Sequence, residues 1–191
     1  MVIFEVIKQL VLTFYVGKGS FQWFYFPFQL CSIPMYVCVV AGITKKEGLY
    51  DACTAFLSTF GLLSGICAFL DTSGFHYPVG ILTVYSYVWH LLLILIGLYS
   101  AAVRNRKEFL QSLYIFIICS IIAEIIDILV TLFMGADINM FYINLLVPTF
   151  QIVVKDVAGM IGNVPAIILY WLSCILGAFV LNTVETLIKR N

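Results

Sequence analysis

Five apolar segments dominate the chain, and each is long enough to cross a lipid bilayer. A transmembrane helix needs about 20 predominantly apolar residues, and only helices and closed barrels satisfy their backbone polar groups inside lipid. The segments therefore predict an all-α fold, a polytopic transmembrane helical bundle. They are residues 23–43, 50–70, 79–103, 108–134 and 161–187.

A further apolar segment, residues 2–16, is short for a crossing at about 1.5 Å per residue. It predicts either a tilted span, giving about six crossings, or an interfacial helix beside five crossings. The chain is 63% hydrophobic and only 10% charged, whereas soluble domains are about 25% charged. No polar stretch is long enough to fold alone, so we expect a single transmembrane domain over residues 1–191.

Basic residues gather in alternate connections between the apolar segments. If successive helices alternate in direction, these residues share one side of the membrane, and the positive-inside rule places that side in the cytoplasm. We therefore expect a multi-pass integral membrane protein with a cytoplasmic C-terminus. The formal net charge is zero, so no basic field suggests a nucleic-acid partner. The basic residues that share this side are Lys45, Lys46, Arg104, Arg106, Lys107, Lys189 and Arg190.

Residues 135–160 separate the last two apolar segments and differ from both. The stretch is apolar but is interrupted by Pro148 and ends with the charged pair Lys155 and Asp156. Because proline lacks a backbone donor and breaks helices, a continuous span is not expected here. We predict a partly re-entrant or interfacial loop on the outer side, before the last helix.

Cys31 lies between Pro27 and Pro34 inside the first long apolar segment. Each proline removes a backbone donor, and in a bilayer such a defect is tolerated only beside protein or a cavity. We therefore expect Cys31 on the interior of the bundle. The six cysteines are isolated, with no C-x-x-C pair, so neither disulfides nor a zinc site is expected. We predict no metal and no cofactor.

Ionisable side chains deep inside the apolar segments are few: His90, Glu124 and Asp127. Such residues are costly in a membrane and usually functional. Counted from the outer side, Cys31 lies about 12 Å deep, Glu124 about 15 Å and His90 about 16 Å, with Asp127 at about 10 Å. Helical spacing places Tyr87 with His90 on one polar face and Glu124 with Asp127 on another. We expect these faces to meet each other or a water-filled cavity.

A thiol, an imidazole and a carboxylate at similar depth suit nucleophilic catalysis. Imidazole can remove the proton of a thiol near neutral pH, and a carboxylate can hold the ring in the useful tautomer. Cys31, His90 and Glu124 are therefore the candidate catalytic residues. Three alternatives stay open: a packing cysteine, a structural histidine, and a proton relay or cation site at Glu124 and Asp127. The candidate substrate-binding residues are Gln29, Tyr87, Asp127, Asn139 and Asn144.

Five short motifs in the same order resemble the YwaF family of membrane proteins, which is related to the transmembrane protein 164 lipid acyltransferases. The segment that ends at Cys31 resembles the Leu-Pro-Leu-His-Leu-Cys motif of the family, although Gln29 replaces its histidine. The resemblance implies an acyl-transfer site in which Cys31 is the nucleophile and His90 its base, in the plasma membrane of a bacterium. The matching stretches are Pro27–Cys31, Gly61–Asp71, Pro78–His90, Asn139–Pro148 and Gly162–Pro165.

Two functions follow from these observations. The first is a membrane-embedded lipid acyltransferase or acyl-hydrolase that forms an acyl thioester on Cys31, with membrane phospholipid as both substrate and surrounding solvent. The second is a small-molecule transporter, or the substrate-binding membrane subunit of one, in which Glu124 and Asp127 contact the ligand or an ion. A purely structural protein ranks last, because it leaves the two intramembrane carboxylates without a purpose.

Overall fold

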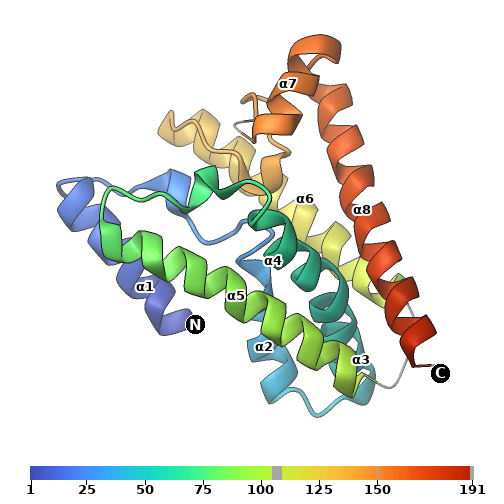
Figure 1. Cartoon of the computed structure of the whole chain (residues 1–191). Coiled ribbons are helices and arrows are strands. Elements are labelled where there is room, and N and C mark those ends of the chain that lie inside the picture. The colour runs from blue at the N-terminus through green and yellow to red at the C-terminus, as the bar shows by residue number, and fades with distance from the viewer. Residues whose placement is uncertain (105–108, 150, 190–191) are drawn as a thin grey trace.

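The computed structural model describes residues 1–104, 109–149 and 151–189, and over these ranges it contains helices and loops but no β-strand. The all-α expectation is therefore confirmed. Figure 1 shows the helices packed as a bundle, with α1 beside α5 at one edge. In chain order they are α1 (Val2–Val11), α2 (Ile33–Ile43), α3 (Glu47–Phe56), α4 (Leu62–Ala68), α5 (Gly80–Val103), α6 (Phe109–Met134), α7 (Ile152–Ile161) and α8 (Asn163–Ile188).

Four helices of the described chain are long and apolar enough to cross a membrane. They are α5, α6, α8 and the continuous helix Glu47–Ala68 that α3 and α4 form together. Their outward faces carry large apolar side chains that suit contact with lipid. The protein is therefore membrane-embedded, while the expected total of about six crossings is not confirmed: α2 is a shorter apolar helix, and α1 continues only through a π-helical turn to Val16.

The segment 23–43 is not one helix, which corrects the sequence prediction. Residues Trp23–Tyr25 form a single 3₁₀ turn, the chain is then irregular, and α2 begins only at Ile33. Pro34 lies in the first turn of α2, where its missing donor costs nothing. The carbonyl of Pro27, in the irregular segment, accepts a hydrogen bond from the Tyr36 hydroxyl at 2.9 Å. Cys31 thus lies in an irregular segment just before a helix.

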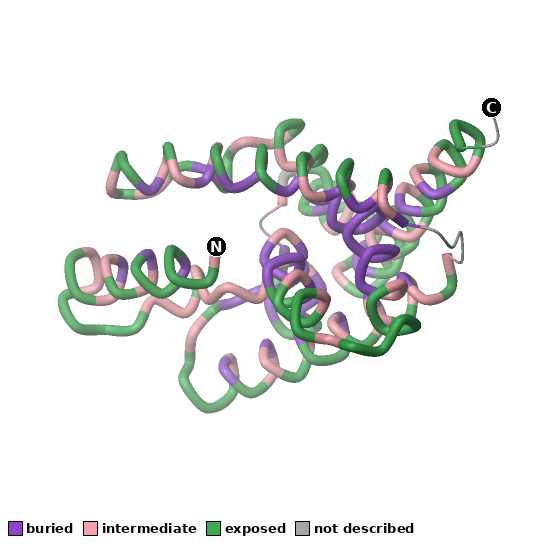
Figure 2. The backbone as a smooth tube through the Cα atoms, turned by 90° about the horizontal axis from the view of Figure 1, so that it is seen from below, coloured by how far each residue is buried: buried purple, intermediate pink, exposed green. Residues whose placement is uncertain are grey.

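The helix Glu47–Ala68 is the centre of the bundle, and most of its residues are buried. Its middle widens into a π-helical segment, Leu57–Gly61, where the Thr59 hydroxyl donates to the Ala55 carbonyl at 2.6 Å. Close approach of α4 and α5 requires small residues, since a Cβ on Gly97 would lie 2.7 Å from Leu62 Cβ. Figure 2 shows buried positions concentrated here, with buried and exposed positions alternating along the outer helices.

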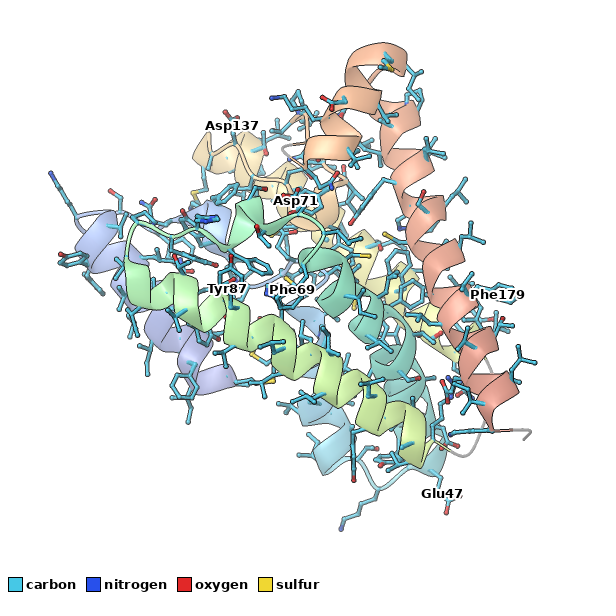
Figure 3. The ribbon with its side chains drawn as sticks, in the orientation of Figure 1. Glu47, Phe69, Asp71, Tyr87, Asp137 and Phe179 are labelled. Carbon is cyan, nitrogen blue, oxygen red and sulfur yellow. The ribbon has the colours of Figure 1, made fainter. Side chains whose placement is uncertain are left out.

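The connections lie at two ends of the bundle. In Figure 3, Asp71 and Asp137 mark one end and Glu47 marks the other. At the Glu47 end the C-termini of α5 and α8 meet, because Glu185 pairs with Arg104 at 3.3 Å and with Lys189 at 3.5 Å. Arg104 and Lys189, two of the basic residues expected on one side, are thus neighbours. Arg106, Lys107 and Arg190 lie outside the described residues.

Residues 135–149 form a loop whose middle is buried in the bundle. Ile138, Met140 and Phe141 have at most 1% of their surface exposed. The loop leads into α7, a helix that the sequence did not predict, and Gly162, at φ 92°, turns the chain into α8. The loop is therefore one wall of the interior space between the helices.

Candidate functional site

A cavity of about 750 Å³ opens among α1, the irregular segment before α2, the end of α4, α5, the 135–149 loop, α7 and α8. This volume lies in the range of ligand-binding pockets. Most of its lining is apolar or aromatic. Cys31 and His90, which are far apart in the sequence, both line it.

Cys31 is partly buried and is held by its backbone. The indole Nε1 of Trp89 donates to the Cys31 carbonyl at 3.1 Å, and Cys31 packs against the buried cluster of Met35, Trp89 and Leu93. Burial raises the pKa of the thiol to about 11, and the Lys8 ammonium offsets only part of that rise. At neutral pH the group is therefore a thiol, which needs a base before it can act as a nucleophile.

His90 is buried, and its ring has a fixed tautomer. Its Nδ1 lies 2.8 Å from the Ser86 carbonyl oxygen. Because a carbonyl can only accept, we assign the proton to Nδ1, which leaves the Nε2 lone pair free. Phe75 stacks on the imidazole with centroids 4.4 Å apart, and Phe69 meets its edge at 6.5 Å. The ring is thus oriented as a proton acceptor through Nε2.

Trp89 and His90 are consecutive residues of α5, and together they place Cys31 and the imidazole at the same cavity. Trp89 anchors the Cys31 backbone, and the next residue, His90, lines the cavity. No hydrogen bond joins the thiol to the imidazole in the described part of the chain. Catalytic hydrogen bonds of this kind are often long or poorly aligned in a free enzyme and tighten only when substrate is bound.

Glu124 does not line the cavity with Cys31 and His90. Its side chain is absent from the cavity lining, and its Oε1 accepts from the Leu145 N–H at 3.3 Å. The expected role of this carboxylate in orienting His90 is taken by the Ser86 carbonyl. The polar face of α6 meets the loop and α8, as the Trp171 indole donating to Ser120 at 3.1 Å also shows, and does not meet the polar face of α5.

The loop wall, residues 138–147, is held by the other predicted polar residues. Both oxygens of Asp127, which is fully buried, accept from the Met140 N–H at 2.8 and 2.9 Å. Gln29 donates to the Asn139 carbonyl at 3.0 Å and accepts from the Phe141 N–H at 2.8 Å. These bonds hold Phe141 and Tyr142 at φ 55° and 59°, a backbone region that non-glycine residues rarely occupy.

Asn139 and Asn144 complete the loop wall from within. The Asn139 amide donates to the Val147 carbonyl at 2.9 Å and its oxygen accepts from the Asn144 N–H at 2.9 Å. The Asn144 amide donates to the Ile138 carbonyl at 2.7 Å and to the Thr131 hydroxyl at 3.1 Å. Gln29 and Asn139 line the cavity, whereas Asp127 and Asn144 do not. All four side chains therefore shape the wall through hydrogen bonds within the protein.

Tyr87 lies next to Phe69 (Figure 3), outside the cavity lining. It packs edge-on against Phe75 with ring centroids 4.8 Å apart, and against Phe69 at 6.3 Å. Since Phe75 stacks on His90, Tyr87 contributes to the aromatic surroundings of the imidazole. It does not reach the space that a substrate would fill.

The α1 wall, made of Glu5, Lys8 and Tyr85, is the part of the site that was not predicted from the sequence. Lys8 Nζ pairs with Glu5 Oε2 at 2.6 Å, and the Tyr85 hydroxyl donates to Glu5 Oε1 at 2.9 Å. All three residues line the cavity. The signal was present in the sequence: two charges three residues apart share one face of a helix whose other residues are almost all apolar.

Tyr77 and Tyr142 bring two hydroxyl groups to the cavity. Neither hydroxyl has a hydrogen-bond partner among the residues that the structure describes. Burial raises the pKa of both, that of Tyr142 to about 12. Both hydroxyls therefore stay protonated at neutral pH and can donate a hydrogen bond to a ligand.

Two further cysteines, Cys67 and Cys174, also line the cavity, and all six cysteines are free thiols. No group of three or more His, Cys, Asp and Glu side chains in the described ranges could hold a metal ion. Asp71 and His76 both line the cavity but have no third ligand in these ranges. Cys31 differs from the other cavity thiols because it lies outside the long helices and just before the N-terminus of α2.

Comparison of the chain with protein-family models, with curated proteins and with solved structures finds no match.

Proposed function

We propose that this protein is a membrane-embedded lipid acyltransferase or acyl-hydrolase that carries the acyl group on Cys31. The observation that supports this most is that Cys31 and His90 line the same mainly apolar cavity, inside a helical membrane protein. A cavity with apolar walls suits an acyl chain. The resemblance to the YwaF family assigns the same two residues.

The reaction begins with His90 Nε2 taking the proton of the Cys31 thiol. The thiolate attacks the ester carbonyl carbon of a phospholipid, forming the carbon–sulfur bond and placing negative charge on the carbonyl oxygen. When the ester carbon–oxygen bond breaks, His90 returns the proton to the leaving oxygen and a lysophospholipid departs. The thioester is then attacked by an acceptor hydroxyl or by water, whose proton passes through His90 to the sulfur.

Donors to the developing oxyanion come from the tyrosines that line the cavity. Tyr77 and Tyr142 are the candidates, because the amide groups of Asn139 and Asn144 already donate to the loop. An oxyanion donor typically contributes a factor of about 10²–10³ to the rate. Tyr142 belongs to the loop wall, which Gln29 and Asp127 hold in place through hydrogen bonds. These two residues therefore act as positioning residues.

The test is turnover of a phospholipid with a labelled acyl chain by purified protein. Cys31→Ser and His90→Ala are each expected to abolish turnover while the bundle stays folded. Cys67→Ala is the matched control, because this thiol also lines the cavity, and it should retain activity. Full activity in Cys31→Ala would show that the mechanism is wrong.

A second candidate function, binding or transport of a small molecule, draws on the aromatic side chains at the cavity, among them Phe24, Tyr25 and Tyr77. Flat aromatic rings of this kind suit a vitamin-like ligand. This function predicts a small molecule that co-purifies with the protein and binds equally well to Cys31→Ala. With Glu124 and Asp127 outside the cavity lining, the expected carboxylate contacts to such a ligand are missing.

We further propose that the C-terminus is cytoplasmic and that the protein resides in the plasma membrane of a bacterium. The support for the orientation is the cluster of Arg104 and Lys189 at one end of the bundle together with the positive-inside rule. The bacterial plasma membrane is what the resemblance to the YwaF family implies. Reporter fusions at the C-terminus test the orientation: alkaline phosphatase should be inactive and a fluorescent protein should fluoresce.

A further inference from the structure

The α1 wall places a buried cation at the cavity. Lys8 has 6% of its surface exposed and Glu5 has 4%, while their helix neighbours Ile3 and Ile7 are 74% and 48% exposed. A helix of this kind turns its apolar face to lipid and its charged face inward. Burying two charges is costly, and replacing such a pair with apolar residues is often neutral or stabilising. Stability alone therefore does not account for the pair.

The hydrogen-bonding capacity of the two charged groups differs. Glu5 Oε1 accepts a hydrogen bond from the Tyr85 hydroxyl, and Glu5 Oε2 is ion-paired with Lys8. An ammonium group has three donors, and its contact with Glu5 is an ion pair at 2.6 Å. The ammonium has no further partner among the described residues, and Lys8 lines the cavity. The ammonium is thus fixed in place and still able to bind an anion.

We propose that Lys8 binds the phosphate of the phospholipid substrate, and that Glu5 and Tyr85 hold the ammonium in position for it. This inference rests on the proposed function for the identity of the ligand. A charge-assisted hydrogen bond between an ammonium group and a phosphate is about twice as strong as one between neutral groups. Lys8 is the residue that distinguishes a phospholipid from a neutral glyceride with the same acyl chains.

The position of the α1 wall relative to Cys31 fits a phospholipid. Cys31 and Tyr85 pack against the same cluster of Met35, Trp89 and Leu93, so the α1 wall adjoins the nucleophile. In a glycerophospholipid only a few covalent bonds separate the phosphate from an ester carbonyl. A phosphate held at Lys8 would therefore bring an ester towards Cys31.

The charges around the cavity favour a phosphodiester over free phosphate. Glu5 and Asp71 both line it together with Lys8, so a free phosphate dianion would face two carboxylates. The phosphodiester of a phospholipid carries a single negative charge, and the acyl chains of the lipid can pack against the apolar walls of the cavity. Burial of those chains is the larger part of the binding free energy.

The experiment measures binding in a protein that cannot react, the Cys31→Ala variant in detergent micelles. Native mass spectrometry records the occupancy of dioleoylphosphatidylcholine against dioleoylglycerol, which has the same chains and no phosphate. Three variants are added to the Cys31→Ala protein: Lys8→Met, Glu5→Gln, and the double variant Glu5→Gln/Lys8→Met, which leaves no unpaired charge. Lys155→Met, an exposed lysine on α7, is the matched control. Inorganic phosphate at constant ionic strength is added as a competitor.

We expect the phospholipid to be preferred over dioleoylglycerol in the Cys31→Ala protein, in its Glu5→Gln variant and in the Lys155→Met control. With Lys8→Met and with the double variant the preference should fall roughly tenfold, the loss of one hydrogen bond to a charged group. Inorganic phosphate should not displace the lipid. The inference is overturned if the folded double variant keeps the preference, or if inorganic phosphate removes it, which would assign the site to free phosphate.

The binding result is separable from the proposed chemistry. A preference that depends on Lys8, in a protein that never forms an acyl adduct on Cys31, would contradict acyl transfer and leave the phosphate site standing. An acyl adduct on Cys31 with no effect of Lys8→Met on lipid preference would contradict the phosphate site alone.

Discussion

The loop wall and the α1 wall border the same cavity but use their polar groups in different ways. On the loop wall, the side chains of Gln29, Asn139 and Asn144 form hydrogen bonds within the protein. On the α1 wall, Lys8 is ion-paired with Glu5 alone among the described residues and keeps donors free. A side chain that is satisfied internally shapes a site, whereas a buried one with spare donors is available to a ligand. The loop wall therefore positions the residues of the site, and the α1 wall is available to bind the ligand.

The largest effect on stability is expected at Asp127. Asp127→Ala removes the acceptor of the buried Met140 N–H, which should cost about 1.5–3 kcal/mol of unfolding free energy. Denaturant titration in micelles, followed by circular dichroism, measures this. Asp156→Ala, an exposed carboxylate on α7, should change nothing. Equal stability of the Asp127 and Asp156 variants would remove the distinction between the two walls.

The next effect concerns Cys31, which lies next to the α1 wall. Because its pKa is about 11 when folded, against an ordinary value of 9.0, its thiolate fraction at pH 8 is roughly a hundredfold lower than that of an unfolded cysteine. Alkylation by iodoacetamide, quantified on the Cys31 peptide, should be slower in the native protein by that factor. The native rate should continue to rise up to about pH 11.

The same pKa has a consequence for stability. Below pH 9 the thiol is protonated in both the folded and the unfolded state, so the contribution of Cys31 is fully present. As the pH rises from 9 towards about 11, only the unfolded state releases the proton, and stability falls. A native alkylation rate that levels off near pH 9 would contradict the burial of this thiol.

A smaller effect is expected at Gln29, which joins the segment before α2 to the loop. Gln29→Ala removes two neutral hydrogen bonds, which should cost about 1–2 kcal/mol. Gln29→Glu keeps the acceptor for the Phe141 N–H and should fall between the wild type and the alanine variant. If Gln29→Ala reduced phospholipid binding without any change in stability, Gln29 would belong with the binding residues.

The smallest effect on stability is expected on the α1 wall. The double variant Glu5→Gln/Lys8→Met replaces a buried ion pair, so its unfolding free energy should stay within about 1 kcal/mol of the wild type. Its phospholipid turnover should nevertheless drop. The same denaturant titration, run beside a turnover assay, separates the two properties. A large loss of stability would make the pair a structural element like the loop wall.

The long apolar helices could be predicted from the sequence. The segments 79–103, 108–134 and 161–187 correspond to α5, α6 and α8 within about two residues. Uninterrupted apolar composition leaves helix as the only structure that satisfies the backbone in lipid. The segment 23–43 has similar composition, yet Pro27 and Pro34 decide its structure, and a hydropathy average does not register two single residues.

The candidate site could be predicted only in part, because its contacts join distant parts of the chain. Helical spacing correctly placed Asp127 on a buried face, but nothing local indicated that a loop residue, Met140, would donate to it. His90 was predicted to be oriented by Glu124 at similar depth, whereas the carbonyl of Ser86, one turn earlier in the same helix, does so. Lys8 lies in the apolar segment 2–16, which was predicted only as a tilted span or an interfacial helix.

The central claim is that Cys31 carries an acyl group taken from phospholipid. Purified protein incubated with a phospholipid is examined by intact-mass and peptide mass spectrometry, with hydroxylamine to cleave thioesters and His90→Ala in parallel. We expect an acyl adduct on Cys31 that hydroxylamine removes and that His90→Ala does not form. A folded protein that forms no adduct with any of several phospholipid classes would contradict the account.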